Sequence, residues 1–150
     1  MLLLSGELNT FAPEEAERIL AGARRALAPS GSVVLEVHPE DAVRSRAEPS
    51  TAWFSADRSV FSDEPHLCLI ERRFDTASRT TLERFFVASG DADELRVYTS
   101  STRAYSDREL DSLLEAADLG RVERYPSLAG TAPEAGEDFV VLVCRDLKRE

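Results

Sequence analysis

The order of segments in the first 37 residues most constrains the fold. Residues 2–4 are three leucines in a row, which is typical of a strand that is buried on both faces. Over residues 13–27, a Pro and two Glu at the start and apolar residues at helical spacing predict a helix. The turn "APSGS" (residues 28–32) ends it, and the β-branched run "SVVLEV" (residues 32–37) predicts a second strand. This order of strand, helix and strand predicts a right-handed parallel crossover.

The middle of the chain differs in composition from its start. Residues 39–65 are rich in Pro, Ser, Asp, Glu and Arg around the aromatic pair Trp53-Phe54, which indicates an irregular or partly helical excursion. Three strands are predicted after it, and the short links "TASR" and "SGDAD" between them make them antiparallel neighbours. These strands are expected at about residues 66–75, 80–88 and 94–105.

The last third returns to a helix followed by strands. "SDRE" (residues 106–109) has the pattern of a capping box, and leucines at helical spacing follow it. Strands are predicted at "RVERYPSL" (residues 121–128) and "DFVVLVCR" (residues 138–145), and the Gly-, Pro- and Ala-rich loop "AGTAPEAGE" separates them.

Composition excludes several classes of function. The chain has 150 residues, which is the size of one domain, and a formal net charge of −10, so its average field repels nucleic acid and anionic lipid. No apolar run approaches the roughly 20 residues that a membrane span needs, and residues 1–4 are too short for a signal peptide. We therefore expect a cytoplasmic protein. Cys68 and Cys144 are isolated from each other in the sequence, so we expect each to be a small buried hydrophobic residue. Because the chain also has only two histidines, we expect no zinc site.

The complete order of elements resembles the C-terminal half of a class I S-adenosylmethionine-dependent methyltransferase. "LLLSGELNTF" is similar to the fourth strand of that family and its loop, and "ILAGARRALAPSGSVVLEVH" to the next helix, Pro-Gly turn and fifth strand. "YSDRELDSLLEAADLGRVERYPSL" is similar to the later helix and sixth strand, and "FVVLVCRD" to the seventh. The resemblance implies an α/β fold with a partial Rossmann-like sheet, mainly parallel with the last strand antiparallel, and a three-stranded antiparallel insertion.

The resemblance also implies a single truncated domain, residues 1–150, with a substrate-binding insertion at about residues 39–105. The Pro-Gly-Gly turn of the family reads Pro29-Ser30-Gly31 here, which a surface turn tolerates. The first three strands of the family have no counterpart, and no GxGxG occurs. Since the ligand of an open α/β sheet lies at its topological switch point, the chain carries one side of that crevice. We expect it to bind S-adenosylmethionine weakly or not at all alone, and Met1 to be an internal or shifted start.

The resemblance places Glu7 and Asn9, which follow the first strand, near the methyl donor and acceptor. Glu7 is then a catalytic and cofactor-binding candidate, and Asn9 a substrate- and cofactor-binding one, because methyl transfer gains chiefly from positioning. The alternative is that Glu7 is solvated and Asn9 caps or turns the loop. His38, at the end of the second predicted strand beside Glu36, is a candidate general base. Equally, His38 can satisfy a loop carbonyl.

Aromatic residues supply the other substrate-binding candidates. Trp53, Phe54 and Phe61 either line the acceptor pocket or, as we favour, anchor an otherwise polar excursion. Tyr105 either reaches the crevice or staples the start of the following helix. A set of charged residues is expected to form cross-strand pairs on a solvated face: Glu71, Arg72, Arg73, Glu83, Arg84 and Arg103.

These observations leave three hypotheses. The first is transfer of a methyl group from S-adenosylmethionine to a small-molecule nitrogen or oxygen acceptor. The second is a non-catalytic assembly module in which the exposed edge of the first strand pairs with another chain, either as a homodimer or with a separately encoded N-terminal half. The third, a small-ligand carrier, fits poorly because carriers of that kind would be antiparallel throughout.

Overall fold

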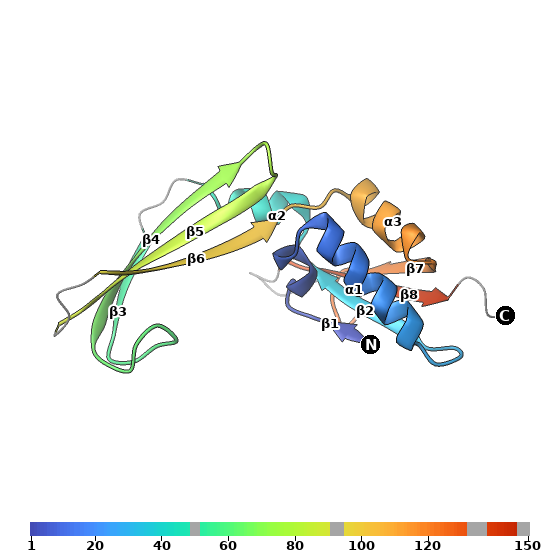
Figure 1. Cartoon of the computed structure of the whole chain (residues 1–150), viewed down its shortest axis with the longest axis horizontal. Coiled ribbons are helices and arrows are strands. Elements are labelled where there is room, and N and C mark those ends of the chain that lie inside the picture. Colours follow the sequence, from blue (N-terminus) through green and yellow to red (C-terminus); the bar gives the residue numbers. More distant parts are fainter. Residues whose placement is uncertain (49–51, 91–94, 132–137, 147–150) are drawn as a thin grey trace. The chain divides into compact units, whose positions relative to one another are not determined.

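A computed structural model describes residues 1–48, 52–90, 95–131 and 138–146 (Figure 1). The chain divides into two compact units. Unit 1 combines Met1–Val43 with Arg103–Glu150, and unit 2 is Arg44–Thr102. No helix in the described ranges is both long and apolar enough to cross a membrane.

Unit 1 contains a four-stranded sheet in the order β1-β2-β8-β7. Its strands are β1 (Leu2–Leu3), β2 (Ser32–Val37), β7 (Leu119–Tyr125) and β8 (Val140–Asp146). β1 is parallel to β2, whereas β8 is antiparallel to both β2 and β7. Three strands therefore run in one direction and the last runs against them, which confirms the predicted mainly parallel sheet with an antiparallel last strand.

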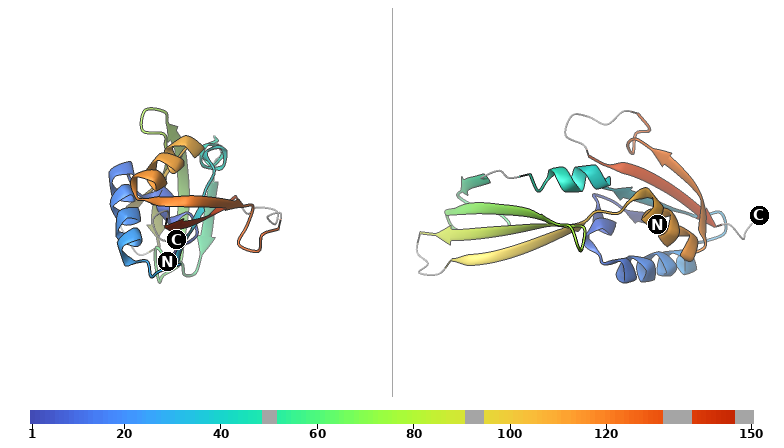
Figure 2. Two further views of the ribbon diagram at one scale, coloured as in Figure 1. Left: turned by 90° about the vertical axis from the view of Figure 1, so that its right-hand side faces the viewer. Right: turned by 90° about the horizontal axis from the view of Figure 1, so that it is seen from above.

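Two helices cover one face of this sheet (Figure 2). They are α1 (Pro13–Ala26) and α3 (Asp107–Ala116), and the short 3₁₀ helix η1 (Glu7–Thr10) precedes α1. β2 alternates, with every second side chain buried against the helices. The main cluster of buried side chains joins both helices to the sheet, and among its members are Leu20, Leu35, Leu114, Leu119 and Leu142.

Both helices begin where the sequence predicts. Pro13 is the first residue of α1, where its missing N–H costs nothing. At α3 the Ser106 hydroxyl accepts a hydrogen bond from the backbone N–H of Glu109 at 3.3 Å, and the Glu109 carboxylate accepts one from the Ser106 N–H at 2.8 Å. The predicted capping box is therefore confirmed.

The first strand differs from its prediction. Leu3 lies opposite Leu35 in the register, on the helix-covered face, while Leu2 lies opposite Val34 on the other face. Leu2 is 63% exposed. The expectation that residues 2–4 are buried on both faces is therefore wrong, because α1 and α3 cover only one face of the described sheet.

Unit 2 is built on a second four-stranded sheet, in the order β3-β4-β5-β6. β4 (His66–Asp75), β5 (Thr80–Ser89) and β6 (Arg96–Arg103) confirm the three predicted strands. β3 (Ala52–Ala56) is a fourth strand, antiparallel to β4, that the sequence prediction missed. The short helix α2 (Glu40–Ser45) confirms that the excursion is partly helical.

β3 was missed because its five residues lie among polar and turn-forming residues. Its pairing depends on β4, which begins ten residues after β3 ends and aligns Trp53 with Leu69. The expected three-stranded insertion is therefore corrected to four strands.

Candidate functional site

The candidate site lies where β1 and β2 end. Parallel strands bring their carboxyl ends to the same edge of a sheet, and in open α/β sheets ligands bind outside that edge. After β1 the chain turns through Ser5 and Gly6, whose φ angles of 57° and 71° are left-handed. Glu36 of β2 holds this turn, because its carboxylate accepts from the Ser5 N–H at 2.6 Å and its backbone carbonyl from the Gly6 N–H at 3.0 Å.

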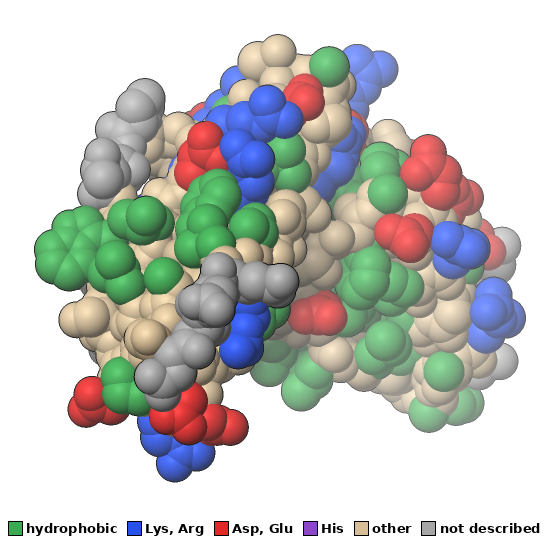
Figure 3. Space-filling model, turned by 60° about the vertical axis from the view of Figure 1, so that its left-hand side comes forward, with side chains coloured by type: hydrophobic (Ala, Val, Ile, Leu, Met, Phe, Trp, Pro, Cys, Tyr) green, Lys and Arg blue, Asp and Glu red, His purple; other side chains and the backbone are tan. Residues whose placement is uncertain are grey.

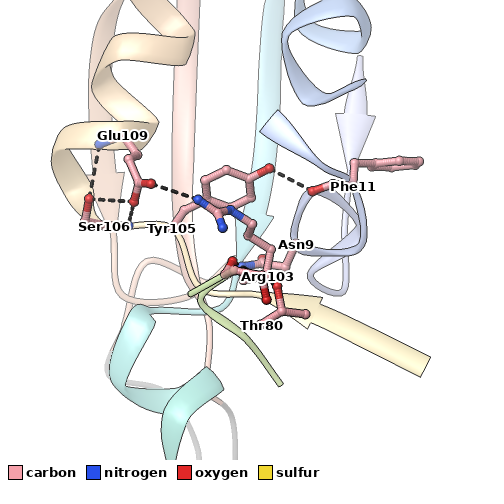
Figure 4. A network of polar contacts seen from close by, with 8 residues as sticks. Asn9, Phe11, Thr80, Arg103, Tyr105, Ser106 and Glu109 are labelled. Carbon is pink, nitrogen blue, oxygen red and sulfur yellow. Dashed lines mark hydrogen bonds and ion pairs between the residues drawn. The ribbon is translucent and has the colours of Figure 1, made fainter. Parts of the chain in front are cut away.

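Asn9 joins three segments that are distant in the sequence. Its Nδ2 donates to the carbonyl of Arg103, beside which it lies in Figure 4, at 2.9 Å. Nδ2 also donates to the carbonyl of His38 at 3.2 Å, and Oδ1 accepts from the His38 N–H at 2.9 Å. The residue is 0% exposed. Its amide therefore links the loop after β1 to His38 and Arg103, which differs from the local cap or turn of the alternative interpretation, while its assignment as a cofactor- or substrate-binding residue stays a prediction.

His38 lies directly after β2 and is buried. Its Nδ1 is 2.9 Å from the Asp138 carbonyl, and because a carbonyl oxygen only accepts, Nδ1 must carry the proton. The imidazole is 5% exposed, and its Cδ2–Nε2 edge lies against Gly6. The ring stacks on Phe139, with centroids 4.2 Å apart. A histidine that satisfies a loop carbonyl is therefore present, and its catalytic role stays a prediction.

Gly6 allows the loop and the imidazole to approach each other. A Cβ atom built at Gly6 would lie 2.4 Å from Cδ2 of His38. Glu7, the first residue of η1, is exposed. The structure thus brings three of the predicted site residues together at one sheet edge: Glu7, Asn9 and His38.

Sequence reasoning assigned no role to Gly6, Asp138 or Phe139. A Ser-Gly pair directly after an apolar run is a turn signal, and it could have marked Gly6 as a position of close approach. No local signal could have found Asp138 or Phe139, because they contact His38 across 100 residues of sequence.

Tyr105 is 2% exposed and does not face solvent. Its hydroxyl donates to the Phe11 carbonyl at 2.8 Å, and burial raises its pKa to about 12. The Arg103 guanidinium lies 5.4 Å from its ring centroid and pairs with Glu109 at 3.0 Å (Figure 4). These contacts place Tyr105 inside unit 1 next to the start of α3, and its assignment to substrate binding stays a prediction.

Trp53 and Phe54 belong to unit 2. They are neighbours on β3, and successive residues of a strand point to opposite faces. Trp53 is 64% exposed, while Phe54 is partly buried with its ring in an edge contact with His66 at 6.2 Å. They cannot line one wall of a pocket together, and their substrate-binding role stays a prediction.

Other contacts in unit 2 match the favoured alternatives. Phe61 lies 5.0 Å from Phe85 and 5.2 Å from Tyr98 between ring centroids, so it anchors the loop before β4. Two of the predicted cross-strand pairs are confirmed. They are Arg72 with Glu83, at 2.7 Å, and Arg84 with Glu71, whose Nε and Oε2 are 2.6 Å apart.

Polar groups of the loop after β1 are engaged within the chain, and binding of S-adenosylmethionine by this chain alone stays a prediction. At the end of β1 the N–H groups of Ser5 and Gly6 and the amide of Asn9 already bind groups of the same chain. Glu7 offers an exposed carboxylate there. A groove of about 410 Å³ between α1 and α3 is lined by residues that include Pro13, Leu113 and the predicted Tyr105, but by none of the three clustered site residues.

No protein-family model and no curated protein matches the sequence. Solved structures do match the fold. A S-adenosylmethionine-dependent methyltransferase from Clostridium acetobutylicum ATCC 824 has a TM-score of 0.73 at 9% identity, over 97% of this chain and 56% of that one. The CcbJ methyltransferase from Streptomyces caelestis has a TM-score of 0.68 at 19% identity, over 97% of this chain and 59% of that one. The sugar N-methyltransferase KedS8 from Streptoalloteichus sp ATCC 53650 has a TM-score of 0.67 at 11% identity, over 97% of this chain and 55% of that one.

The chain therefore spans between 55% and 59% of the length of these three structures. At such low identities the likeness concerns the fold. The observed sheet order, the antiparallel last strand and the second sheet agree with the resemblance found in the sequence. The chain has the fold of part of a class I S-adenosylmethionine-dependent methyltransferase.

Proposed function

We propose that this chain is the acceptor-side half of a methyltransferase that modifies a nitrogen or oxygen nucleophile of a small molecule. In this proposal S-adenosylmethionine is held mainly by a segment outside the chain. The supporting observation is that Asn9 and His38 are hydrogen-bonded at the carboxyl ends of two parallel strands, with the exposed Glu7 two residues before Asn9. This is the edge at which open α/β sheets bind ligands.

The three residues would divide the work. The exposed carboxylate of Glu7 can accept a hydrogen bond from an amine or hydroxyl and so orient it, and orientation is the main source of rate in methyl transfer. Asn9 keeps the loop fixed through its three hydrogen bonds. His38 is the candidate base for the proton that the acceptor releases. The cofactor supplies the methyl group when it is bound.

Amino sugars are the first acceptors to test. KedS8, one of the matching structures, is described as a sugar N-methyltransferase. An amine offers both the nucleophilic lone pair and the N–H donors that a carboxylate such as Glu7 can orient.

The test begins with the DNA upstream of the Met1 codon. We expect it to encode, in frame or in a neighbouring frame, a strand followed by a Gly-rich loop. The combined or co-expressed protein should form S-adenosylhomocysteine when it is given amino sugars. Glu7→Gln should lower kcat by about tenfold or more, since it removes a charge-assisted contact.

Glu14→Gln is the matched control, because Glu14 is also an exposed carboxylate but lies on α1. It should leave kcat unchanged. The proposal fails if no such segment is encoded, or if Glu7→Gln turns over at the rate of the unmodified protein.

The second candidate function, a non-catalytic assembly module, has one observation in its favour. Leu2 is 63% exposed, and β1 pairs only with β2 among the described strands. An apolar edge strand of this kind can add a strand from another chain. Leu2→Lys would disrupt such an assembly without altering Glu7 or His38.

A further inference from the structure

One face of the unit 2 sheet carries apolar side chains that remain exposed. The register aligns Trp53 of β3 with Leu69 of β4, and Leu69 with Phe86 of β5, so the three side chains form a row across the sheet. In the neighbouring row, Leu67 lies opposite Ser55 and Ala88. We call this side of the sheet the Trp53 face.

Exposure on this face is high for residues of such size. Trp53 is 64%, Leu69 45% and Leu67 39% exposed. On the opposite face Cys68 and Val87 are almost fully buried. An antiparallel sheet with one wet face normally carries polar residues on that face, and a cluster of large exposed apolar residues marks an interaction surface. Figure 3 shows hydrophobic side chains gathered on the forward surface, with charged ones beside them.

The same face becomes charged further along the strands. Glu71 of β4 lies opposite Arg84 of β5 and pairs with it, each side chain being 51% exposed. The next row aligns Arg73 with Leu82. The Trp53 face therefore has an apolar end and an end with adjacent charges of opposite sign.

This pattern is complementary to itself. A two-fold axis parallel to the strands and midway between β4 and β5 brings β4 of one copy over β5 of a second. Leu69 then lies over Phe86, and Glu71 over Arg84, so that apolar meets apolar and each charge meets its opposite. Isologous contacts of this kind are the commonest in soluble oligomers.

The face is also large enough for a stable contact. β4 and β5 have ten residues each, or about 33 Å of strand, and four strands span about 19 Å. Because β3 has five residues and β6 eight, the flat footprint is roughly 500 Å², and protruding side chains raise it towards the roughly 800 Å² per partner of a standard interface.

We propose that the Trp53 face binds the Trp53 face of a second copy of this chain, forming a homodimer by packing of two sheets. The formal net charge of −10 argues against nucleic acid or anionic lipid as the occupant. This proposal does not depend on the proposed methyl transfer, because it concerns residues of unit 2 only.

Sedimentation equilibrium and light scattering test the association. We expect the mass of two chains at micromolar concentration. Leu69→Glu and Trp53→Glu should each weaken the dimer by about tenfold or more, because a buried charge without a partner replaces a central apolar contact. Val60→Glu is the control, since Val60 is 95% exposed but lies in the loop before β4, and it should leave the dimer intact.

Trp53 is the only tryptophan in the chain, so its fluorescence reports on this face directly. As the concentration rises and the dimer forms, the emission should move to shorter wavelength and quenching by acrylamide should fall. Leu69→Glu should abolish both changes.

A charge exchange separates an intermolecular role from an internal one. Glu71→Arg alone and Arg84→Glu alone should each weaken the homodimer, because like charges then face each other across the two-fold axis. An equimolar mixture of the two variants should dimerise again, because each charge now meets its opposite on the other chain. An ion pair that matters only within one chain would not be rescued by mixing.

Three results would overturn the proposal. The first is a monomeric chain at concentrations up to about 100 μM, which excludes an affinity of biological use. The second is a dimer that survives Leu69→Glu and Trp53→Glu. The third is a dimer that is lost in Leu2→Lys and kept in those two variants, which would assign the contact to the edge of β1. Circular dichroism of each variant checks that it is folded.

Discussion

Asn9 and His38 are joined by two hydrogen bonds in which the side-chain amide of one residue meets the backbone of the other. The Asn9 amide bonds both the N–H and the carbonyl of His38, the residue after β2, as a neighbouring strand would do. Its third bond, to the Arg103 carbonyl, ties in the end of β6. One fully buried side chain thus sets the geometry of the candidate site.

Asn9→Ala should destabilise the protein by about 3 kcal/mol. The substitution leaves the His38 N–H and two carbonyls without their partner in the interior, and each such loss costs roughly 1–3 kcal/mol when water cannot replace it. Urea denaturation measures the change in the free energy of unfolding. Thr10→Ala, which removes an exposed hydroxyl from the same 3₁₀ helix, should change it by less than about 0.5 kcal/mol. Equal effects of the two substitutions would contradict the role assigned to Asn9.

Gly6→Ala should be more costly than Gly130→Ala. Both glycines have a left-handed φ, of 71° and 73°, so both substitutions incur the backbone cost of roughly 1–2 kcal/mol. Only at Gly6 would the new Cβ meet another group, His38, whose ring is fixed by Asp138 and Phe139.

The expected cost is therefore about 1 kcal/mol for Gly130→Ala and about 3 kcal/mol for Gly6→Ala, since steric overlap in a packed site adds roughly 1–3 kcal/mol. Thermal and urea unfolding of the two variants provide the comparison. If both cost the same, the close approach of Gly6 to His38 does not constrain the loop.

Tyr105→Phe should change how stability depends on pH. Burial raises the pKa of Tyr105 from 10 to about 12, so the folded state favours the neutral phenol. The corresponding stability is fully present below pH 10 and is lost as the pH rises from 10 towards 12. Between pH 9 and 11 the unmodified protein should lose about 1 kcal/mol more than the variant, which has no hydroxyl to ionise.

At neutral pH the same variant should be less stable by about 1 kcal/mol, because the Phe11 carbonyl loses its donor. Urea unfolding at several pH values tests both statements. Tyr125→Phe is the comparison: the hydrogen bond to the Glu123 carboxylate also raises the pKa of Tyr125, but this phenol is on the surface, so its removal should change the pH dependence less than Tyr105→Phe does. Parallel pH profiles for Tyr105→Phe and the unmodified protein would show that the phenol of Tyr105 is not buried.

The chain alone should bind S-adenosylmethionine with a dissociation constant weaker than about 1 mM, or an affinity of no more than about 4 kcal/mol. The reason is that the polar groups at the end of β1 are already hydrogen-bonded within the chain, and that the sequence contains no GxGxG. Isothermal titration calorimetry measures the affinity. Submillimolar binding would show that this chain holds the cofactor without help.

The elements with strong local signals were predictable from the sequence. α3 was predictable because Ser106 and Glu109 form its capping box and leucines recur at helical spacing. The start of α1 followed from Pro13. β3 was not predictable, because five residues among polar neighbours become a strand only when β4 aligns Trp53 with Leu69. Register of this kind is a tertiary property that a local pattern does not contain.

The candidate site was predictable in part. Glu7, Asn9 and His38 were placed near a sheet edge because each follows a predicted strand. In the structure Asn9 and His38 are hydrogen-bonded there, and Glu7 begins the same 3₁₀ helix as Asn9. It was not possible to predict that the partners of Asn9 are backbone groups 29 and 94 residues away. Nor could the partner of the Tyr105 hydroxyl be predicted, since it is a carbonyl 94 residues away in the turn before α1.

The place of β8 in the sheet affects how the protein is made. β8 is the last strand in the sequence, yet it lies between β2 and β7 and bonds to both. During synthesis, which proceeds from the N-terminus at roughly 5–20 residues per second, β2 and β7 have no partner between them until residues 140–146 leave the ribosome. Unit 2 is complete earlier, and its β4–β5 hairpin needs only a short link. Unit 2 can therefore fold while unit 1 waits for β8, and a chain truncated before residue 140 would lack the strand that joins β2 to β7.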